Sequence, residues 1–198
     1  MKNTVRLIVF ISLIPFFDLI LKALGVYGGL GANPIETIIH TTGDWGLRIL
    51  IVTLLLTPLG YYSDIAFFRQ FPKPIGLVAF FYSLMHFLSY AIIDQSGDIK
   101  IIIVDIIETP YLIVGWGGFL CLLFMGIASH KRLQPWFNKN RSTISGIVYT
   151  AAVLAVWHYF WQTKTVELES VIYIAIICIL MLWRLKITTA KNKDIQSL

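Results

Sequence analysis

Two histidines lie within hydrophobic segments that are long enough to cross a lipid bilayer. His86 belongs to the segment 74–93, and His158 belongs to the segment 144–161. An imidazole in hydrocarbon is unfavourable unless it is bonded to a partner, so a histidine at membrane depth indicates a functional site. Two such histidines on separate segments predict the two axial ligands of one haem iron.

The two histidines are predicted to lie at nearly the same depth in the membrane. His86 is eight residues before Asp94, where its segment ends, and His158 is five residues before Thr163. A helix rises about 1.5 Å per residue, so the two depths differ by about 5 Å. Imidazoles at one level on facing helices can hold a porphyrin between them. The residues alone leave a second interpretation open, in which each histidine is simply bonded to a neighbouring backbone carbonyl.

Other polar side chains near the same side of the membrane are candidates for cofactor binding. The Arg48 guanidinium suits a haem propionate, because arginine forms bidentate bonds with carboxylates, but it could equally extend to the membrane surface. His40 is expected at the outer surface, where it either caps a helix or contacts a propionate or a docked partner. His130 lies in a basic loop and is expected to be solvated. The sequence has no nucleophile–base–acid set and no zinc-type cluster, so the chemistry is expected to be that of a cofactor.

The composition indicates an integral membrane protein. The chain has 198 residues, of which 57% are hydrophobic and 14% are charged, and its mean hydropathy is +0.76. Soluble domains carry about 25% charged residues. Cys121 and Cys178 both fall inside apolar blocks, so neither a disulfide nor a Cys-X-X-Cys site is expected. A net charge of +5 without a basic and aromatic stripe does not indicate nucleic-acid binding.

The apolar blocks predict an all-α bundle of six membrane-spanning helices, because about 20 residues of helix cross the hydrocarbon. Asn33 is a favourable N-cap that would extend the second span through the residues 34–42. The segment 98–108 is too short to span and predicts an interfacial helix on the outer surface. No internal repeat is visible. The six predicted spans are 5–26, 45–60, 75–94, 110–129, 144–163 and 170–187.

The charges predict the orientation of these spans. Twelve of the 16 basic residues fall on one side, and most of the acidic residues fall on the other. Because cytoplasmic loops are rich in lysine and arginine, both termini are expected in the cytoplasm. The residues 1–187 then form one transmembrane domain, and the residues 188–198 form a polar cytoplasmic tail. The four basic residues on the outer side are Lys22, Arg48, Lys100 and Lys164.

Four segments, in order, resemble one family of bacterial membrane proteins. They are Gly28–Leu59, Ile75–Asp94, Thr109–Gly115 and Val148–Lys164. In these segments the chain is similar to the MsrQ (YedZ) family, which belongs to the ferric-reductase-like transmembrane group. Members of that family are haem-binding membrane subunits of the periplasmic methionine sulfoxide reductase system.

The resemblance implies that His86 and His158 ligate a b-type haem in the bacterial inner membrane. It implies that electrons pass from the quinone pool or a cytoplasmic flavin reductase to a periplasmic molybdopterin methionine sulfoxide reductase. That catalytic subunit repairs oxidised periplasmic proteins, so the present chain would be a non-catalytic electron-transfer subunit. The resemblance also implies FMN as a further cofactor.

The sequence departs from the family pattern in three places. Ser145 occupies the position of a further family histidine, and serine is a poor iron ligand. It lies thirteen residues before His158, which is about 20 Å along a helix. We therefore expect about one haem per chain. Thr109 replaces an arginine, and Lys73 stands alone where the family has paired basic residues; both changes concern the flavin and the inner electron-entry site.

Two other functions compete with electron transfer to a dedicated partner. A stand-alone ferric or quinone reductase of the cytochrome b type would be favoured by a fused cytoplasmic flavin and nicotinamide domain, and the chain ends soon after the sixth predicted span. A non-redox membrane protein such as a small transporter would need polar groups along a path. The predicted spans are poor in such groups.

Overall fold

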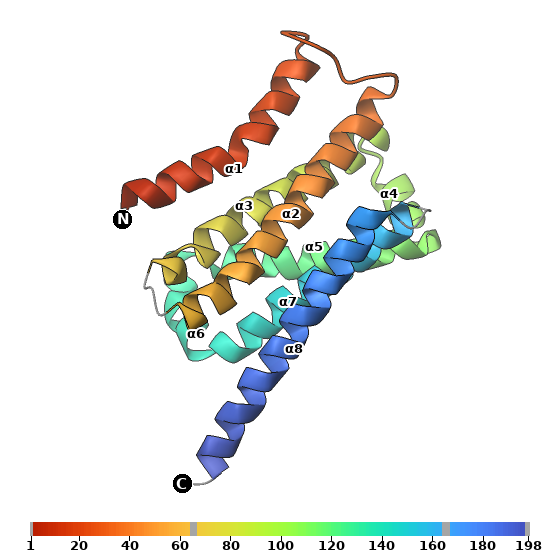
Figure 1. Ribbon diagram of the computed structural model, residues 1–198. Helices are drawn as coiled ribbons and strands as arrows, with labels where there is room; N and C mark the ends of the chain where they lie inside the picture. Colours follow the sequence, from red (N-terminus) through yellow and green to blue (C-terminus); the bar gives the residue numbers. More distant parts are fainter. Residues whose placement is uncertain (1, 64–66, 164–166, 197–198) are drawn as a thin grey trace.

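The protein is built of helices, as its hydrophobic blocks predict (Figure 1). The computed structural model describes residues 2–63, 67–163 and 167–196, and this part of the chain contains no strand. Lys164, predicted on the outer side, lies outside the described residues. The α-helices are α1 (Lys2–Ala23), α2 (Pro34–Tyr62), α3 (Pro72–Leu88), α4 (Ile99–Glu108), α5 (Pro110–Ala128), α6 (Gln134–Lys139), α7 (Arg141–Gln162) and α8 (Leu168–Gln196). Three short segments are η1 (Phe68–Gln70), the π-helical η2 (Ser89–Asp94) and η3 (Lys131–Leu133).

Among the described residues, six helices are long and apolar enough to cross a membrane, which confirms the predicted number of spans and their approximate positions. They are Asn3–Ala23, Pro34–Tyr62, Pro72–Asp94, Pro110–Ala128, Thr143–Gln162 and Leu168–Thr189. The chain is a multi-pass membrane protein. Helix α8 continues past the last span to Gln196, so the backbone of the predicted polar tail extends the helix through that residue.

Helix α2 begins where its capping residue predicts. The Asn33 side chain accepts a hydrogen bond from the Glu36 N–H at 3.3 Å, and Asn33 Nδ2 donates to Glu36 Oε2 at 2.9 Å. Pro34 occupies the first helical position, where its missing N–H is not needed. This cap starts α2 outside the predicted span and brings Ile39 and His40 into the helix.

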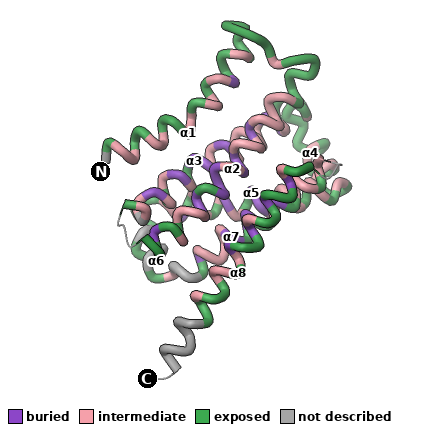
Figure 2. The backbone as a smooth tube through the Cα atoms, in the orientation of Figure 1, coloured by how far each residue is buried: buried purple, intermediate pink, exposed green. Residues whose placement is uncertain are grey.

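Four helices form the core of the bundle. Helix α2 packs along α3, α5 packs along α7, and α3 contacts α5 between the two pairs. Figure 2 shows that buried residues concentrate on these four helices. Helix α1 lies against α2 and α3, and α8 lies against α2 and α7. Both α1 and α8 leave most of their apolar side chains exposed, as expected for helices whose outer surface faces lipid.

A tyrosine of α3 connects α1 to the bundle. The buried Tyr82 hydroxyl donates to the Ser12 carbonyl at 3.0 Å and accepts the Phe16 N–H at 3.1 Å. These are the two backbone groups that a helical hydrogen bond would join, and Pro15 lies between them. Side chains of neighbouring helices commonly satisfy backbone groups near a proline kink in a membrane, and α1 bends along its length (Figure 1).

The short helix predicted in the segment 98–108 is present as α4, and its place at the outer membrane surface stays a prediction. Its N-cap, Asp98, accepts hydrogen bonds from the N–H groups of Lys100 and Ile101 at 2.9 and 3.2 Å. None of its residues is fully buried. The π-helical turn η2, which the sequence did not predict, precedes this segment and is separated from it by the residues 95–97. The Tyr90 hydroxyl of η2 donates to Asp105 Oδ2 of α4 at 2.6 Å, so this bond holds α4 against the bundle.

Candidate cofactor site

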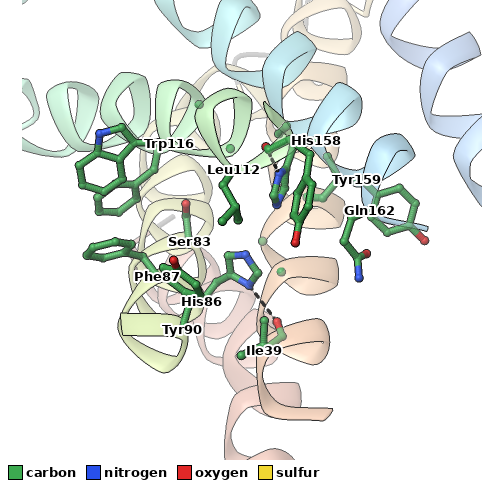
Figure 3. A pocket seen from close by; sticks show the side chains of 18 of the residues that line it. Ile39, Ser83, His86, Phe87, Tyr90, Leu112, Trp116, His158, Tyr159 and Gln162 are labelled. Atoms are coloured by element: carbon green, nitrogen blue, oxygen red, sulfur yellow. Dashed lines mark hydrogen bonds between the residues drawn. The ribbon is translucent and has the colours of Figure 1, made fainter. Parts of the chain in front are cut away.

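The structure brings His86 and His158 together, as their matched depths predict. His86 comes from α3 and His158 comes from α7. Their ring centroids are 6.2 Å apart, and the two ring planes meet at 75°. Figure 3 shows the two imidazoles turned toward one another across a cavity between the helix pairs.

Each imidazole is held by a backbone carbonyl of the helix beside it. His86 Nδ1 lies 2.9 Å from the Ile39 carbonyl oxygen, and His158 Nδ1 lies 2.8 Å from the Tyr111 carbonyl oxygen. A ring nitrogen facing a carbonyl oxygen must carry the proton and donate it, so Nε2 of each neutral ring is the unprotonated nitrogen. The bond to a carbonyl therefore uses only Nδ1 of each ring, and Nε2 keeps a lone pair with which it could bind a metal ion.

The spacing of the two rings fits two ligands of one metal ion. A metal–imidazole bond is about 2 Å long and Nε2 lies roughly 1 Å from the ring centre, so two axial imidazoles need ring centres about 6 Å apart. The observed separation is 6.2 Å. Two neutral imidazoles on opposite sides are also a donor set that haem iron takes. The residues present therefore fit the predicted haem.

The cavity between the helix pairs has a volume of about 320 Å³, within the range of small-molecule sites. Apolar side chains of the four core helices line its walls, including Leu47, Leu50 and Phe119. Polar side chains line it as well, and they come from the parts of α2, η2, α4 and α7 nearest the predicted outer surface. These are His40, Asp44, Tyr90, Asp94, Asp105 and Gln162. The apolar walls suit a flat apolar ring.

Two glycines, which were not among the predicted site residues, lie directly against the two imidazoles. A Cβ atom on Gly43 would lie 3.0 Å from His86 Cε1 and Nδ1. A Cβ atom on Gly115 would lie 2.7 Å from His158 Nδ1 and 2.8 Å from Cε1. Both glycines line the cavity. In the sequence, Gly43 lies just before the second predicted span and Gly115 lies inside the fourth, and neither position by itself indicates contact with an imidazole.

The two other predicted cofactor residues lie in different places. His40 lines the cavity, with Nε2 3.0 Å from Gln162 Nε2 and 3.7 Å from Glu36 Oε1. Arg48 does not line it; its Nη2 donates to Glu169 Oε1 at 2.7 Å and its Nε donates to the Tyr173 hydroxyl at 3.0 Å. Arg48 therefore joins α2 to α8. Contact of either side chain with a propionate stays a prediction.

The remaining predicted positions lie away from the cavity. His130 is exposed in the connection after α5, in agreement with the expected solvation. Ser145 lies near the start of α7, thirteen residues before His158. Within residues 2–63, 67–163 and 167–196, no group of three or more histidine, cysteine, aspartate or glutamate side chains could hold a metal ion.

Comparison with known proteins gives concordant results. Residues 42–157 match the family described as the ferric reductase like transmembrane component. The protein-methionine-sulfoxide reductase heme-binding subunit MsrQ of Brucella anthropi is 35% identical over 170 residues, which is 86% of this chain and 77% of that protein. The subunit of the same name from Brucella ovis is 36% identical over 162 residues, covering 82% of this chain and 73% of that protein.

Proposed function

The chain belongs to the ferric reductase like transmembrane family and to the MsrQ family of heme-binding subunits, and on this premise we propose that it is a membrane electron-transfer subunit containing a b-type haem. The observation that carries the proposal is the pair of carbonyl-bonded imidazoles with ring centroids 6.2 Å apart. His86 and His158 would hold the iron through Nε2. When bound, the haem supplies a centre that gains and loses one electron.

The surrounding residues prepare the site for this role. The Ile39 and Tyr111 carbonyls keep each Nδ1 protonated, which fixes the tautomer and increases the basicity of the ligand nitrogen. Leu47, Leu50 and Phe119 exclude water from the walls of the cavity. A dry site with neutral ligands affects the reduction potential through its low polarity. No substrate chemistry is assigned to this chain's own side chains.

The names of the relatives support a methionine sulfoxide reductase as the partner. We propose that both termini are cytoplasmic in a bacterial inner membrane and that the α4 side faces the periplasm, because most basic residues lie on the opposite side. Electrons would enter from the quinone pool or a cytoplasmic flavin reductase, with FMN as a further cofactor. They would leave to a periplasmic molybdopterin methionine sulfoxide reductase, which docks near α4 and the residues 28–44 and repairs oxidised proteins.

The stoichiometry of the haem tests this proposal most directly. We expect the purified protein to show a reduced-minus-oxidised spectrum of a low-spin b-type haem, with about one haem per chain. Ser145→Ala should leave the haem content unchanged, because a serine hydroxyl is a poor iron ligand. A ratio near two haems per chain would disprove the single-site proposal, and a colourless protein would disprove the haem function itself.

A further inference from the structure

The two helix pairs around the cavity repeat one another at a constant spacing of 72 residues, contrary to the expectation that the chain has no internal repeat. The first set consists of His86 and the two groups next to its ring, which are the Ile39 carbonyl and Gly43. The second set consists of His158 and the two groups next to its ring, which are the Tyr111 carbonyl and Gly115. Each member of the second set lies 72 residues after its counterpart.

The packing of the two helix pairs repeats with the same spacing. A Cβ atom on Gly46 of α2 would lie 3.4 Å from Tyr82 Cβ and 3.5 Å from the Ser83 nitrogen of α3. A Cβ atom on Gly118 of α5 would lie 3.5 Å from Leu154 Cβ and 3.6 Å from the Ala155 nitrogen of α7. The helices of each pair therefore approach one another at equivalent residues. The tripeptide Ile-Glu-Thr also recurs, at 35–37 and at 107–109.

The position of each glycine explains how an imidazole reaches a carbonyl inside a helix. In an α-helix the carbonyl of residue i already accepts the N–H of residue i+4. Gly43 is four residues after Ile39, and Gly115 is four residues after Tyr111. The residue at i+4 is thus next to the carbonyl that the imidazole must approach. A side chain there would occupy the space of Nδ1 and Cε1, the ring edge that makes the hydrogen bond.

We propose that Gly43 and Gly115 are positioning residues that, together with the carbonyls of Ile39 and Tyr111, fix the rotation of the two imidazoles. This inference rests on the proposed haem function and concerns the orientation of the ligands. The hydrogen bond fixes the direction in which Nδ1 points, and contact with the glycine fixes the position of the ring edge formed by Nδ1 and Cε1. We call each pair of one carbonyl and one glycine a clamp: Ile39 with Gly43, and Tyr111 with Gly115. The two clamps together hold the ligand planes at the observed angle of 75°.

The angle between the ligand planes has a spectroscopic consequence. In a low-spin ferric haem, nearly perpendicular axial imidazoles give a strongly anisotropic electron paramagnetic resonance (EPR) signal, whereas parallel imidazoles give a rhombic signal. Orientation of the axial ligands is also one of the ways in which a protein tunes its haem. The wild-type protein should therefore show the strongly anisotropic signal. A rhombic signal from wild-type protein that contains its haem would overturn the proposal without any substitution.

The substitutions Gly43→Ala and Gly115→Ala test the role of each glycine. Each methyl group should turn its imidazole, shift the EPR signal and the midpoint potential, and weaken haem retention by about 10-fold, as changes next to a metal ligand commonly do. Gly117→Ala is the matched control on α5, since its Cβ atom would meet only Leu154 Cδ1, at 3.4 Å. It should leave the EPR signal and the potential unchanged.

The outcomes separate this inference from the proposed function. If wild-type protein binds haem while Gly43→Ala and Gly115→Ala both retain its EPR signal and potential, the positioning role is wrong and the haem function stands. If wild-type protein binds no haem, the proposed function itself is wrong. Circular dichroism of each variant identifies a failure to fold, in which case the wild-type EPR signal alone decides.

Discussion

The helix pairs α2–α3 and α5–α7 are alike at the residues that hold the two imidazoles and where the two helices of each pair pack, and they differ where they contact other helices. Each pair supplies a histidine, a carbonyl and a glycine at equivalent positions. Two residues that contact helices outside the first pair have no polar counterpart in the second pair: the counterpart of Arg48 is Leu120, and the counterpart of Tyr82 is Leu154. Arg48 attaches the first pair to α8, and Tyr82 attaches it to α1. The comparison teaches that the two pairs are equivalent around the proposed cofactor and where their own helices pack, whereas residues that meet neighbouring helices differ.

Removal of either histidine should cause the largest loss of haem binding, and the loss should be equal for the two helix pairs. His86→Ala and His158→Ala each leave one imidazole, so the iron would be five-coordinate or lost. We expect the low-spin spectrum to disappear in both variants, as measured by visible spectroscopy of purified protein. His130→Ala is the control, because this side chain is exposed and remote from the cavity. A normal spectrum for either of the first two variants would show that the proposed ligand pair is wrong.

Alanine substitution of Gly43 and Gly115 should show how closely the two imidazole sites resemble one another. Gly115→Ala should disturb the haem more than Gly43→Ala, because the added Cβ atom would approach the ring to 2.7 Å rather than 3.0 Å. A contact below about 3 Å requires the ring or the helix to move, and overpacking commonly costs about 1–3 kcal/mol. The measurement is haem retention during a titration with apomyoglobin as acceptor. Equal losses would show that the two clamps are equally tight.

Breaking the Arg48 ion pair should destabilise only the attachment of α8. Arg48→Met removes the hydrogen bonds to Glu169 and Tyr173 and should lower the free energy of unfolding by about 2 kcal/mol, as loss of a hydrogen bond to a charged group does. Thermal unfolding in detergent measures this loss. Leu120→Met, at the equivalent position of the other pair, should be neutral because Leu120 is exposed on the bundle surface. A low-spin spectrum unlike the wild-type one in Arg48→Met would instead favour the predicted propionate contact.

Removal of the Tyr82 hydroxyl should give the smallest loss of stability. Tyr82→Phe removes two hydrogen bonds to α1 and should cost about 1 kcal/mol while preserving the packing of the ring. Tyr149→Phe is the matched control, since the buried Tyr149 hydroxyl has no hydrogen-bond partner among the described residues. Protease accessibility of a tag placed before α1 measures the detachment. Equal stability of the two variants would show that Tyr82 does not hold α1.

The sequence was sufficient to predict features that depend on hydropathy and helix rise. The six spans follow from blocks of about 20 apolar residues, and the meeting of His86 and His158 follows from counting residues to the ends of their spans. The partner of Arg48 could not be predicted, because hydropathy does not specify how α2 is rotated toward α8. The repeat was also missed. It lies in contacts between backbone and imidazole at a few positions such as Gly43 and Gly115, whereas most residues between those positions differ.

The Tyr82 bridge has a consequence for the order in which the protein is assembled during synthesis. The hydroxyl that binds the Phe16 N–H lies 66 residues later in the chain. Spans enter the bilayer as separate helices before they associate, so α1 must remain in lipid with only its own backbone bonds until the third span arrives. The first span to be made is therefore anchored only after two later ones, and a truncated chain ending before Tyr82 would lack this anchor.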